Sequence, residues 1–423
     1  MKLLKKLLNN DYSISIIKKF IMIFLGLITS ALTVRTLGLY LKGQQAYILN
    51  IENMLMLIFN FGVHNAYSVM RKQGYDLQKL KRKYFDFCFM LFIIYLIISI
   101  VSFILFPNDL LPLVFILTTF NIYAGQLGNI LMIEDFKAHS ILYTLNTVFN
   151  LGIVFVVYVC FPKNLIAVLL TYLATSTFII IGCMWKLEVF PKLTRGSIKF
   201  SKKLIVLGFY PMLIGLLNVM NYNFDTIMLK NMAVPYDLIG LYSIGTALAG
   251  YLWLLPDIFK DISFSRSAKG DSIDSVCFSL RLSNTITLLL MIVIVVFGKV
   301  IIYILYGLEY VPAYEVTIFI LMGVPALGIF KIVSPVYIAN SRSKYVFYVL
   351  LLSVISNIIL NYLMIPYFSI NGAAIASLIS YGLCGIVILE NFKHRYRKKM
   401  RDLFLVNLND VRKIGKFIMN DER

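Results

Sequence analysis

The sequence predicts an all-α membrane protein of about twelve transmembrane helices, arranged as two six-helix bundles. Hydrophobic residues make up 60% of the 423 residues and charged residues only 14%, which is too apolar for a water-soluble chain. Apolar runs of about 20 residues, the length that crosses a bilayer as a helix, recur along the whole chain. One strongly basic stretch, residues 186–203, lies near the middle. It divides the apolar runs into two equal sets.

Each apolar run is interpreted as one helical crossing. The predicted spans before the basic stretch are 14–34, 46–69, 84–106, 111–133, 141–161 and 165–185, and those after it are 204–229, 238–259, 280–297, 311–339, 346–365 and 372–392. Six is an even number, so both sets begin on the same side of the membrane. This is the arrangement of transporters built from parallel repeats, which a pseudo-two-fold axis along the membrane normal relates.

Two similar stretches support this division. FPKNLIAVLLTYLATST at 161–177 and IPYFSINGAAIASLISYG at 365–382 each join a proline turn to a span of small and apolar residues. We therefore expect an N-terminal bundle over residues 1–187 and a basic cytoplasmic linker over 188–203. The C-terminal bundle is expected over 204–392, and a basic tail at the membrane interface over 393–423.

The distribution of the 40 Lys and Arg residues predicts the orientation of the chain. Most of them fall in the N-terminal segment, the loops after even-numbered spans and the tail. Lys331 lies within a span, and the opposite side has only Arg35, Lys42, Lys163, Lys230 and Lys299. The positive-inside rule then places both termini and the middle loop in the cytoplasm. The net charge of +19 is thus a topology signal, and it favours anionic lipid headgroups over nucleic acid as the partner of these loops.

Two helical stripes of polar residues are candidates for a binding site. They occur in the predicted seventh and eleventh spans, and consist of Asn218, Asn221 and Asp225 and of Ser353, Asn357 and Asn361. Their spacing places each set on one helix face, which cannot comfortably contact lipid. The side chains either bind substrate in a water-accessible cavity or form hydrogen bonds between helices without a ligand.

Ionisable residues within the spans are the second group of candidates, because a charge at this depth is costly. Glu52, Asp225 and Glu315 are candidates for ion coupling, or for pairing with Arg35 or a neighbouring helix. Lys331 either binds a phosphate group or extends its ammonium group to the cytoplasmic interface. Arg35 is either a phosphate contact on the release side or an interfacial anchor.

Proline and glycine residues predict where a helix bends. Pro211 lies within the seventh span, and Gly208 and Gly215 flank it. Proline removes one backbone hydrogen bond and kinks a helix, so these three residues are candidates for a hinge, although a rigid kink would have the same pattern. The sequence has no nucleotide-binding loop, metal-ligand cluster or nucleophile–base pair, and we expect no enzymatic activity, metal or cofactor.

Three motifs carry a resemblance to a known family. They are RTLG at 35–38, DTIML at 225–229, and the stretch 340–382, which begins NSRSKYVFYV and ends ASLISYG. With these motifs the chain resembles the polysaccharide repeat-unit flippases (Wzx type) of the multidrug/oligosaccharidyl-lipid/polysaccharide exporter superfamily. The resemblance covers all twelve predicted spans, and residues 340–382 are its most diagnostic part.

This resemblance implies a flippase of the bacterial inner membrane. Such a protein moves undecaprenyl-diphosphate-linked oligosaccharide from the cytoplasmic to the outer leaflet by alternating access. Twelve spans favour a role in O-antigen or capsule synthesis, and hence in lipopolysaccharide biosynthesis, over that of the longer relatives that act on lipid II. The diphosphate or sugar would contact Lys331, Arg35, Asn218, Asn221, Asn357 and Asn361. Further partners would be membrane lipids, a polysaccharide polymerase and a chain-length regulator.

Two other function classes are compatible with parts of this pattern. A drug or cation antiporter of the same superfamily would share the fold but have an acidic and aromatic cavity, whereas a lipid diphosphate requires a cationic one. A polysaccharide polymerase or membrane glycosyltransferase would need a sizeable outer loop or carboxylates at a loop. The predicted outer loops are too short for the second class.

Overall fold

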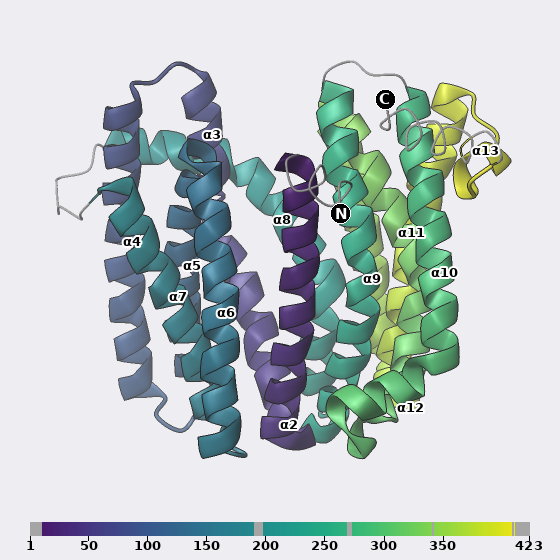
Figure 1. Cartoon of the computed structure of the whole chain (residues 1–423), viewed down its shortest axis with the longest axis horizontal. Coiled ribbons are helices and arrows are strands. Elements are labelled where there is room, and N and C mark those ends of the chain that lie inside the picture. The colour runs from purple at the N-terminus through teal and green to yellow at the C-terminus, as the bar shows by residue number, and fades with distance from the viewer. Residues whose placement is uncertain (1–10, 190–197, 269–272, 341, 408–409, 411–423) are drawn as a thin grey trace, which may run out of the picture. The chain divides into compact units, whose positions relative to one another are not determined.

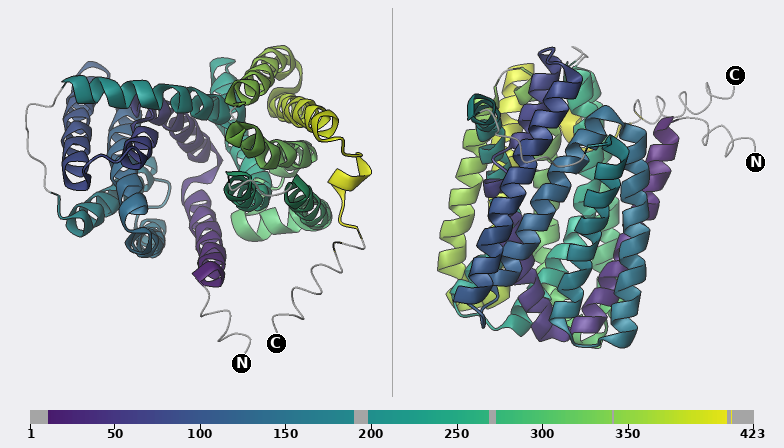
Figure 2. Two further views of the ribbon diagram at one scale, coloured as in Figure 1. Left: turned by 90° about the horizontal axis from the view of Figure 1, so that it is seen from above. Right: turned by 90° about the vertical axis from the view of Figure 1, so that its left-hand side faces the viewer.

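The computed structural model describes residues 11–189, 198–268, 273–340, 342–407 and 410. These residues form helices and contain no β-strand, which confirms the predicted all-α class. The chain divides into two compact units, Met1–Leu216 and Leu217–Arg423. Seen from above, most helices within each unit are viewed nearly end-on, as in a helical bundle (Figure 2).

The first unit contains six helices and the beginning of a seventh. They are α2 (Asp11–Phe59), α3 (Val63–Lys72), α4 (Leu77–Leu105), α5 (Leu111–Glu134), α6 (Phe136–Cys160), α7 (Leu165–Leu187) and α8 (Ile198–Asn231), which continues into the second unit. The second unit adds α9 (Tyr236–Ala268), α10 (Ile273–Tyr306), the short 3₁₀ helix η1 (Leu308–Tyr310), α11 (Ala313–Ala339), α12 (Ser343–Tyr396) and α13 (Arg401–Phe404). Figure 1 labels most of these elements.

Ten helices of the described chain are long and apolar enough to cross a membrane. Two of them are interrupted, α2 at Gly38 and α12 at Ser369, where the backbone has a positive φ. In Figure 1, α2 descends from its N-terminal end and returns toward α3. With 49 and 54 residues, each interrupted helix is long enough for two crossings of about 20 residues. The structure is therefore compatible with the twelve expected crossings.

The predicted second span, residues 46–69, is not one continuous helix. Helix α2 ends at Phe59, and α3 begins at Val63 after a turn in which Phe61 and Gly62 have φ values of 49° and 62°. At Gly62 the backbone lies against the backbone of Gly208, where a Cβ atom would overlap the Gly208 carbonyl group. The helix breaks here because this close approach and the left-handed conformation both favour glycine, which apolar run length does not reveal.

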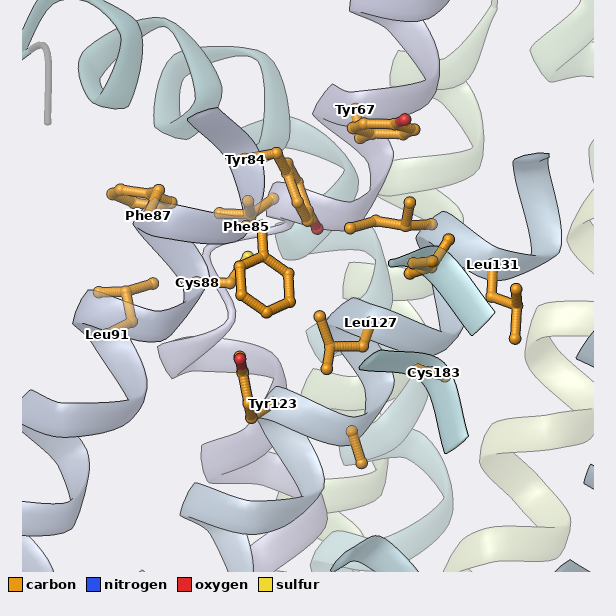
Figure 3. Close-up of a cluster of buried hydrophobic side chains, with 14 of the residues drawn as sticks. Tyr67, Tyr84, Phe85, Phe87, Cys88, Leu91, Tyr123, Leu127, Leu131 and Cys183 are labelled. Carbon is orange, nitrogen blue, oxygen red and sulfur yellow. The ribbon is translucent and has the colours of Figure 1, made fainter. Parts of the chain in front are cut away.

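Aromatic side chains form much of the core of the first unit. Tyr67 of α3, Tyr84 and Phe85 of α4, and Tyr123 of α5 are buried together with Cys183 of α7 (Figure 3). The Tyr67 and Tyr84 rings meet edge to face, with centroids 5.0 Å apart, a favourable geometry for two rings. These contacts join three consecutive helices to α7.

Helix α11 is the central helix of the second unit. It contacts α9, α10 and α12, and its residues Val316, Ile320, Val324 and Leu327 are almost completely buried. A helix that is apolar on all sides is expected to be enclosed by others. Much of this helix is thus enclosed by its three neighbours.

The C-terminal segment folds back onto α10. Helix α13 contacts α10, and Leu403 within it is buried. Asp410 accepts hydrogen bonds from Nη2 and Nε of the Arg281 side chain at 2.7 and 2.5 Å. The first part of the predicted interfacial tail thus packs on the protein itself. Residues 190–197 of the predicted middle loop and residues 411–423 of the tail lie outside the described residues.

Candidate functional site

A buried carboxylate, Asp225 of α8, is the centre of a polar network in the second unit. It accepts hydrogen bonds from the hydroxyl group of Tyr242 on α9 at 2.7 Å and from the amide of Asn361 on α12 at 2.6 Å. Ser377 of α12 donates a third. All four residues are nearly inaccessible to solvent. Hydrogen bonds to a charged group at this depth stabilise its ionised form.

The same network extends along α8 and both halves of α12. Ser353 donates to the side-chain oxygen of Asn221 at 3.1 Å, and Asn361 donates to that of Asn357 at 3.0 Å. Asn357 approaches the hydroxyl group of Ser380 at 3.5 Å. The two stripes predicted from the sequence therefore meet each other. Asn218, one turn before Asn221, is only partly buried.

Three members of the network were not among the predicted site residues: Tyr242, Ser377 and Ser380. Single hydroxyl groups are common in membrane helices, where they bond to the backbone of their own helix. The available signal was the spacing of Ser377 and Ser380, three residues apart on the face that also contains Ala373 and Ala376. Two amide atoms, Asn221 Nδ2 and Asn361 Oδ1, have no hydrogen-bond partner among the described residues. The network thus has capacity for a further polar ligand.

Lys331 of α11 lies in a second polar group of the same unit. Its ammonium nitrogen is 3.0 Å from Oδ2 of Asp257 on α9. It also lies over the rings of Tyr222 and Trp253, 5.5 and 5.6 Å from their centroids, within the range of a cation–π contact. These two rings, with centroids 5.1 Å apart, contact Tyr381 of α12 as well. A carboxylate and two aromatic faces therefore surround the ammonium group.

In the first unit, Glu52 is buried on α2. It accepts a hydrogen bond of 2.9 Å from Asn121 of α5, whose side-chain oxygen in turn accepts one from Ser176 of α7. Its partner is thus an uncharged amide rather than Arg35, which is exposed. Nearby, Gln126 donates to Asn60 at 3.0 Å, and Asn60 contacts His64 at 3.0 Å.

Glu315 does not belong with the buried carboxylates, contrary to expectation. It is exposed in the first turn of α11 and accepts a 3.0 Å hydrogen bond from Asn371. A carboxylate in the first turn of a helix is favoured by the helix dipole. This position explains the residue without any ligand.

The three hinge candidates lie in α8, close to the boundary between the two units, which falls after Leu216. Gly208 packs against the backbone of Phe61 and Gly62, so a Cβ atom could not be accommodated there. At Gly215 an added Cβ atom would be in ordinary contact, 3.6 Å from Leu57. The structure thus gives Gly208 a packing role within the first unit, while Pro211 and Gly215 stay candidates for bending.

Three solved structures resemble the whole chain. "Lipid II flippase MurJ, inward closed conformation" superposes with a TM-score of 0.74 at 16% identity, over 96% of this chain and 92% of that chain. A multidrug resistance MATE family transporter of the MOP superfamily, in an inward-facing conformation, has a TM-score of 0.66 at 12% identity, over 88% and 94%. A MOP superfamily transporter from Pyrococcus furiosus has 0.60 at 13%, over 90% and 94%. The chain therefore shares its fold with these three structures.

A family model supports the same relationship at the level of sequence. The model of the lipid II flippase MurJ matches residues 252–418, which include Asp257, Lys331 and Asn361. No curated protein was found to match the sequence. The names of the matched family and of the three structures describe flippases and transporters, and none describes an enzyme.

Proposed function

We propose that the chain is a flippase that moves undecaprenyl-diphosphate-linked oligosaccharide repeat units from the cytoplasmic to the outer leaflet by alternating access. The observation that carries this proposal is the position of Lys331, a mostly buried cation in the part of the chain that matches the lipid II flippase model. A diphosphate needs such a cation, because charge-assisted hydrogen bonds to phosphate oxygens are among the strongest available.

The O-antigen or capsule repeat unit is the proposed cargo because of the sequence resemblance and the twelve expected crossings. Lipid II, named by the matching family model, is the second candidate. Both are transported by the same proposed chemistry at Lys331. The two candidates are distinguished by measuring flipping in vesicles that contain the purified protein and one of the two lipid-linked substrates. The substrate that is flipped faster is the main cargo.

Asp225 is the proposed ion-coupling residue, and Glu52 the alternative. Asp225 accepts three hydrogen bonds from buried side chains, and an ionisable group at this depth in a membrane protein is a candidate for a role in transport. With the cytoplasm negative, each net negative charge that moves outward gains about 2.3 kcal/mol per 100 mV. Export driven by potential alone would therefore need neither carboxylate. Transport with and without an imposed potential, measured for D225N and E52Q, decides between these mechanisms.

The protein is proposed to lie in the inner membrane with both termini in the cytoplasm. The positive-inside rule supports this orientation, since the segment after α7 and the C-terminal segment are both basic. Reporter fusions after Lys203 and after Arg423 should both give a cytoplasmic signal. A periplasmic signal from either fusion contradicts the span count. A polysaccharide polymerase and a chain-length regulator are the proposed protein partners.

The proposal is tested directly by substitution of Lys331. K331Q should reduce flipping by about tenfold or more, since it removes a charged hydrogen bond of about 1.5–3 kcal/mol. K331R should retain much of the activity because arginine keeps the charge and binds phosphate oxygens. The measurement is flipping of a lipid-linked repeat unit in vesicles at matched protein levels. Normal flipping by K331Q would contradict the role of Lys331.

In cells, loss of the protein should leave lipid-linked repeat units on the inner leaflet while sugar transfer continues. Surface polysaccharide should then fall. If the repeat units are instead exposed outside but not polymerised, the chain acts as a polymerase and the proposal is wrong.

A further inference from the structure

Asp257 is the counter-ion of Lys331, and no role in transport has been assigned to it above. One of its oxygens is 3.0 Å from the Lys331 ammonium nitrogen, and the other is 3.7 Å from that of Lys260, one turn later on α9. Two ammonium groups thus share one carboxylate. These three side chains together carry one positive charge that they do not neutralise among themselves, and this favours the binding of an additional anion.

The members of this group differ in their access to water. The side chain of Lys331 is 11% exposed and that of Asp257 is 35% exposed. An anion that arrives from water therefore meets the position of Asp257 before it reaches Lys331. Water can therefore compete for the Asp257 carboxylate, and this weakens its contact with Lys331 relative to a fully buried ion pair. The contact between Asp257 and Lys331 is consequently one that a stronger anion can replace.

The aromatic rings of Tyr222 and Trp253 explain how Lys331 can stay in place during such an exchange. Both ring centroids lie within 6 Å of the ammonium nitrogen, where the face of an aromatic ring attracts a cation. The rings cannot replace a carboxylate, but they hold the ammonium group at one position. Less conformational freedom is then lost when the anion binds.

We infer that Asp257 is an exchangeable counter-ion, which holds Lys331 until the diphosphate of the substrate takes its place. This inference rests on the proposed function, since it specifies how that diphosphate reaches Lys331. A diphosphate carries more negative charge than one carboxylate and has several acceptor oxygens for the three ammonium protons. The released Asp257 returns to water and keeps Lys260 as a neighbour. Asp257 thus neutralises Lys331 while the site is empty, and Lys331 becomes available to bind the diphosphate when the substrate enters.

The test measures binding of farnesyl diphosphate, a short polyprenyl diphosphate, to the purified full-length protein in detergent. D257N removes the competing charge and should tighten binding, by about threefold to tenfold, which corresponds to about 0.7–1.4 kcal/mol. K331Q should weaken binding, and the double variant D257N/K331Q should match K331Q. Weaker or unchanged binding by D257N overturns the inference, because a structural partner of Lys331 would not compete with the ligand.

D274N is the matched control. Asp274 also pairs with a lysine, Lys398, at 2.6 Å, and it lies in the same unit. D274N removes the same charge from another lysine pair and should leave probe affinity unchanged. An equal gain in both variants overturns the inference, since it would reflect net charge alone. If D257N does not fold, D257S removes the same charge and provides the same comparison.

Two competitors identify the anion. Inorganic pyrophosphate should displace the probe, whereas phosphatidylglycerol at the same concentration should not, because its single phosphate has less charge. Equal displacement by phosphatidylglycerol overturns the diphosphate assignment. Flipping assays distinguish this result from failure of the proposed function: tighter probe binding by D257N without any flipping of lipid-linked sugar supports the exchange and contradicts the flippase.

Discussion

The two units hold their buried carboxylates in different ways. In the first unit, Glu52 accepts one hydrogen bond, from the uncharged amide of Asn121. Glu134 accepts hydrogen bonds from Tyr67 and from Arg71, and the Arg71 side chain is 41% exposed. In the second unit, Asp225 accepts three hydrogen bonds. Asp410 accepts two from Arg281, which is 10% exposed, and a third from the backbone of Asn407.

This difference indicates which carboxylates have more donors that depend on them. Removing one oxygen of a carboxylate that accepts from three donors leaves buried donors without an acceptor. If a carboxylate accepts only one hydrogen bond, from an amide, then replacing that carboxylate with an amide should cost the protein little stability. We therefore expect each charge-removing substitution to be more harmful in the second unit than its counterpart in the first.

The largest difference is expected between D410N and E134Q. D410N leaves the Arg281 guanidinium group buried beside a neutral side chain, which should destabilise the protein by about 3 kcal/mol. E134Q affects a more exposed pair and should cost about 1 kcal/mol or less. Thermal melting in detergent measures both. Equal shifts in melting temperature would show that the buried Arg281 guanidinium group does not need the charge of Asp410 for the stability of the protein.

The next difference is expected between D225N and E52Q. In D225N, one oxygen is replaced by an NH₂ group that faces the donors Tyr242, Asn361 or Ser377, at a cost of about 1–3 kcal/mol. In E52Q, the remaining side-chain oxygen can still accept from Asn121, and less than about 1 kcal/mol is lost. Melting temperatures compare the two variants. If E52Q is the more harmful variant, the carboxylate of the first unit is the one held as an anion.

The smallest difference is expected between S377A and S176A. Ser377 donates to the carboxylate of Asp225, whereas Ser176 donates to the neutral amide oxygen of Asn121. Bonds to charged groups contribute about 1.5 kcal/mol or more, and neutral ones about 1 kcal/mol. S377A should thus lower the melting temperature slightly more than S176A. The reverse order would mean that Asp225 is not ionised.

Several features could be predicted from the sequence because they depend on local composition. A span is predicted by about 20 consecutive apolar residues, and the stripes of Asn221 and Asp225 and of Asn357 and Asn361 are predicted by helical spacing alone. That such stripes face protein rather than lipid also follows locally, from the cost of a polar group in hydrocarbon. The fold class was therefore predicted correctly, whereas the contact between the two stripes was not predicted and is seen only in the structure.

Other features depend on which helices become neighbours. Lys331 and Asp257 are 74 positions apart, and no local pattern in the sequence assigns one to the other. Ser377 and Tyr242 became part of the site only when α9 and α12 were placed beside α8. Glu315 was expected to be buried because it falls within the predicted span 311–339, but it is exposed in the first turn of α11.

The sequence by itself determined which segments are helices that cross a membrane, because the transfer of an apolar helix into lipid depends only on the residues of that helix. It also determined that the stripe of Asp225 must face other helices. The tertiary structure alone decided which donors surround each charge, since hydrogen bonds and ion pairs require atoms within about 3 Å. Such distances are set by the packing of helices such as α8, α9 and α12, whose neighbours no single segment of the chain specifies.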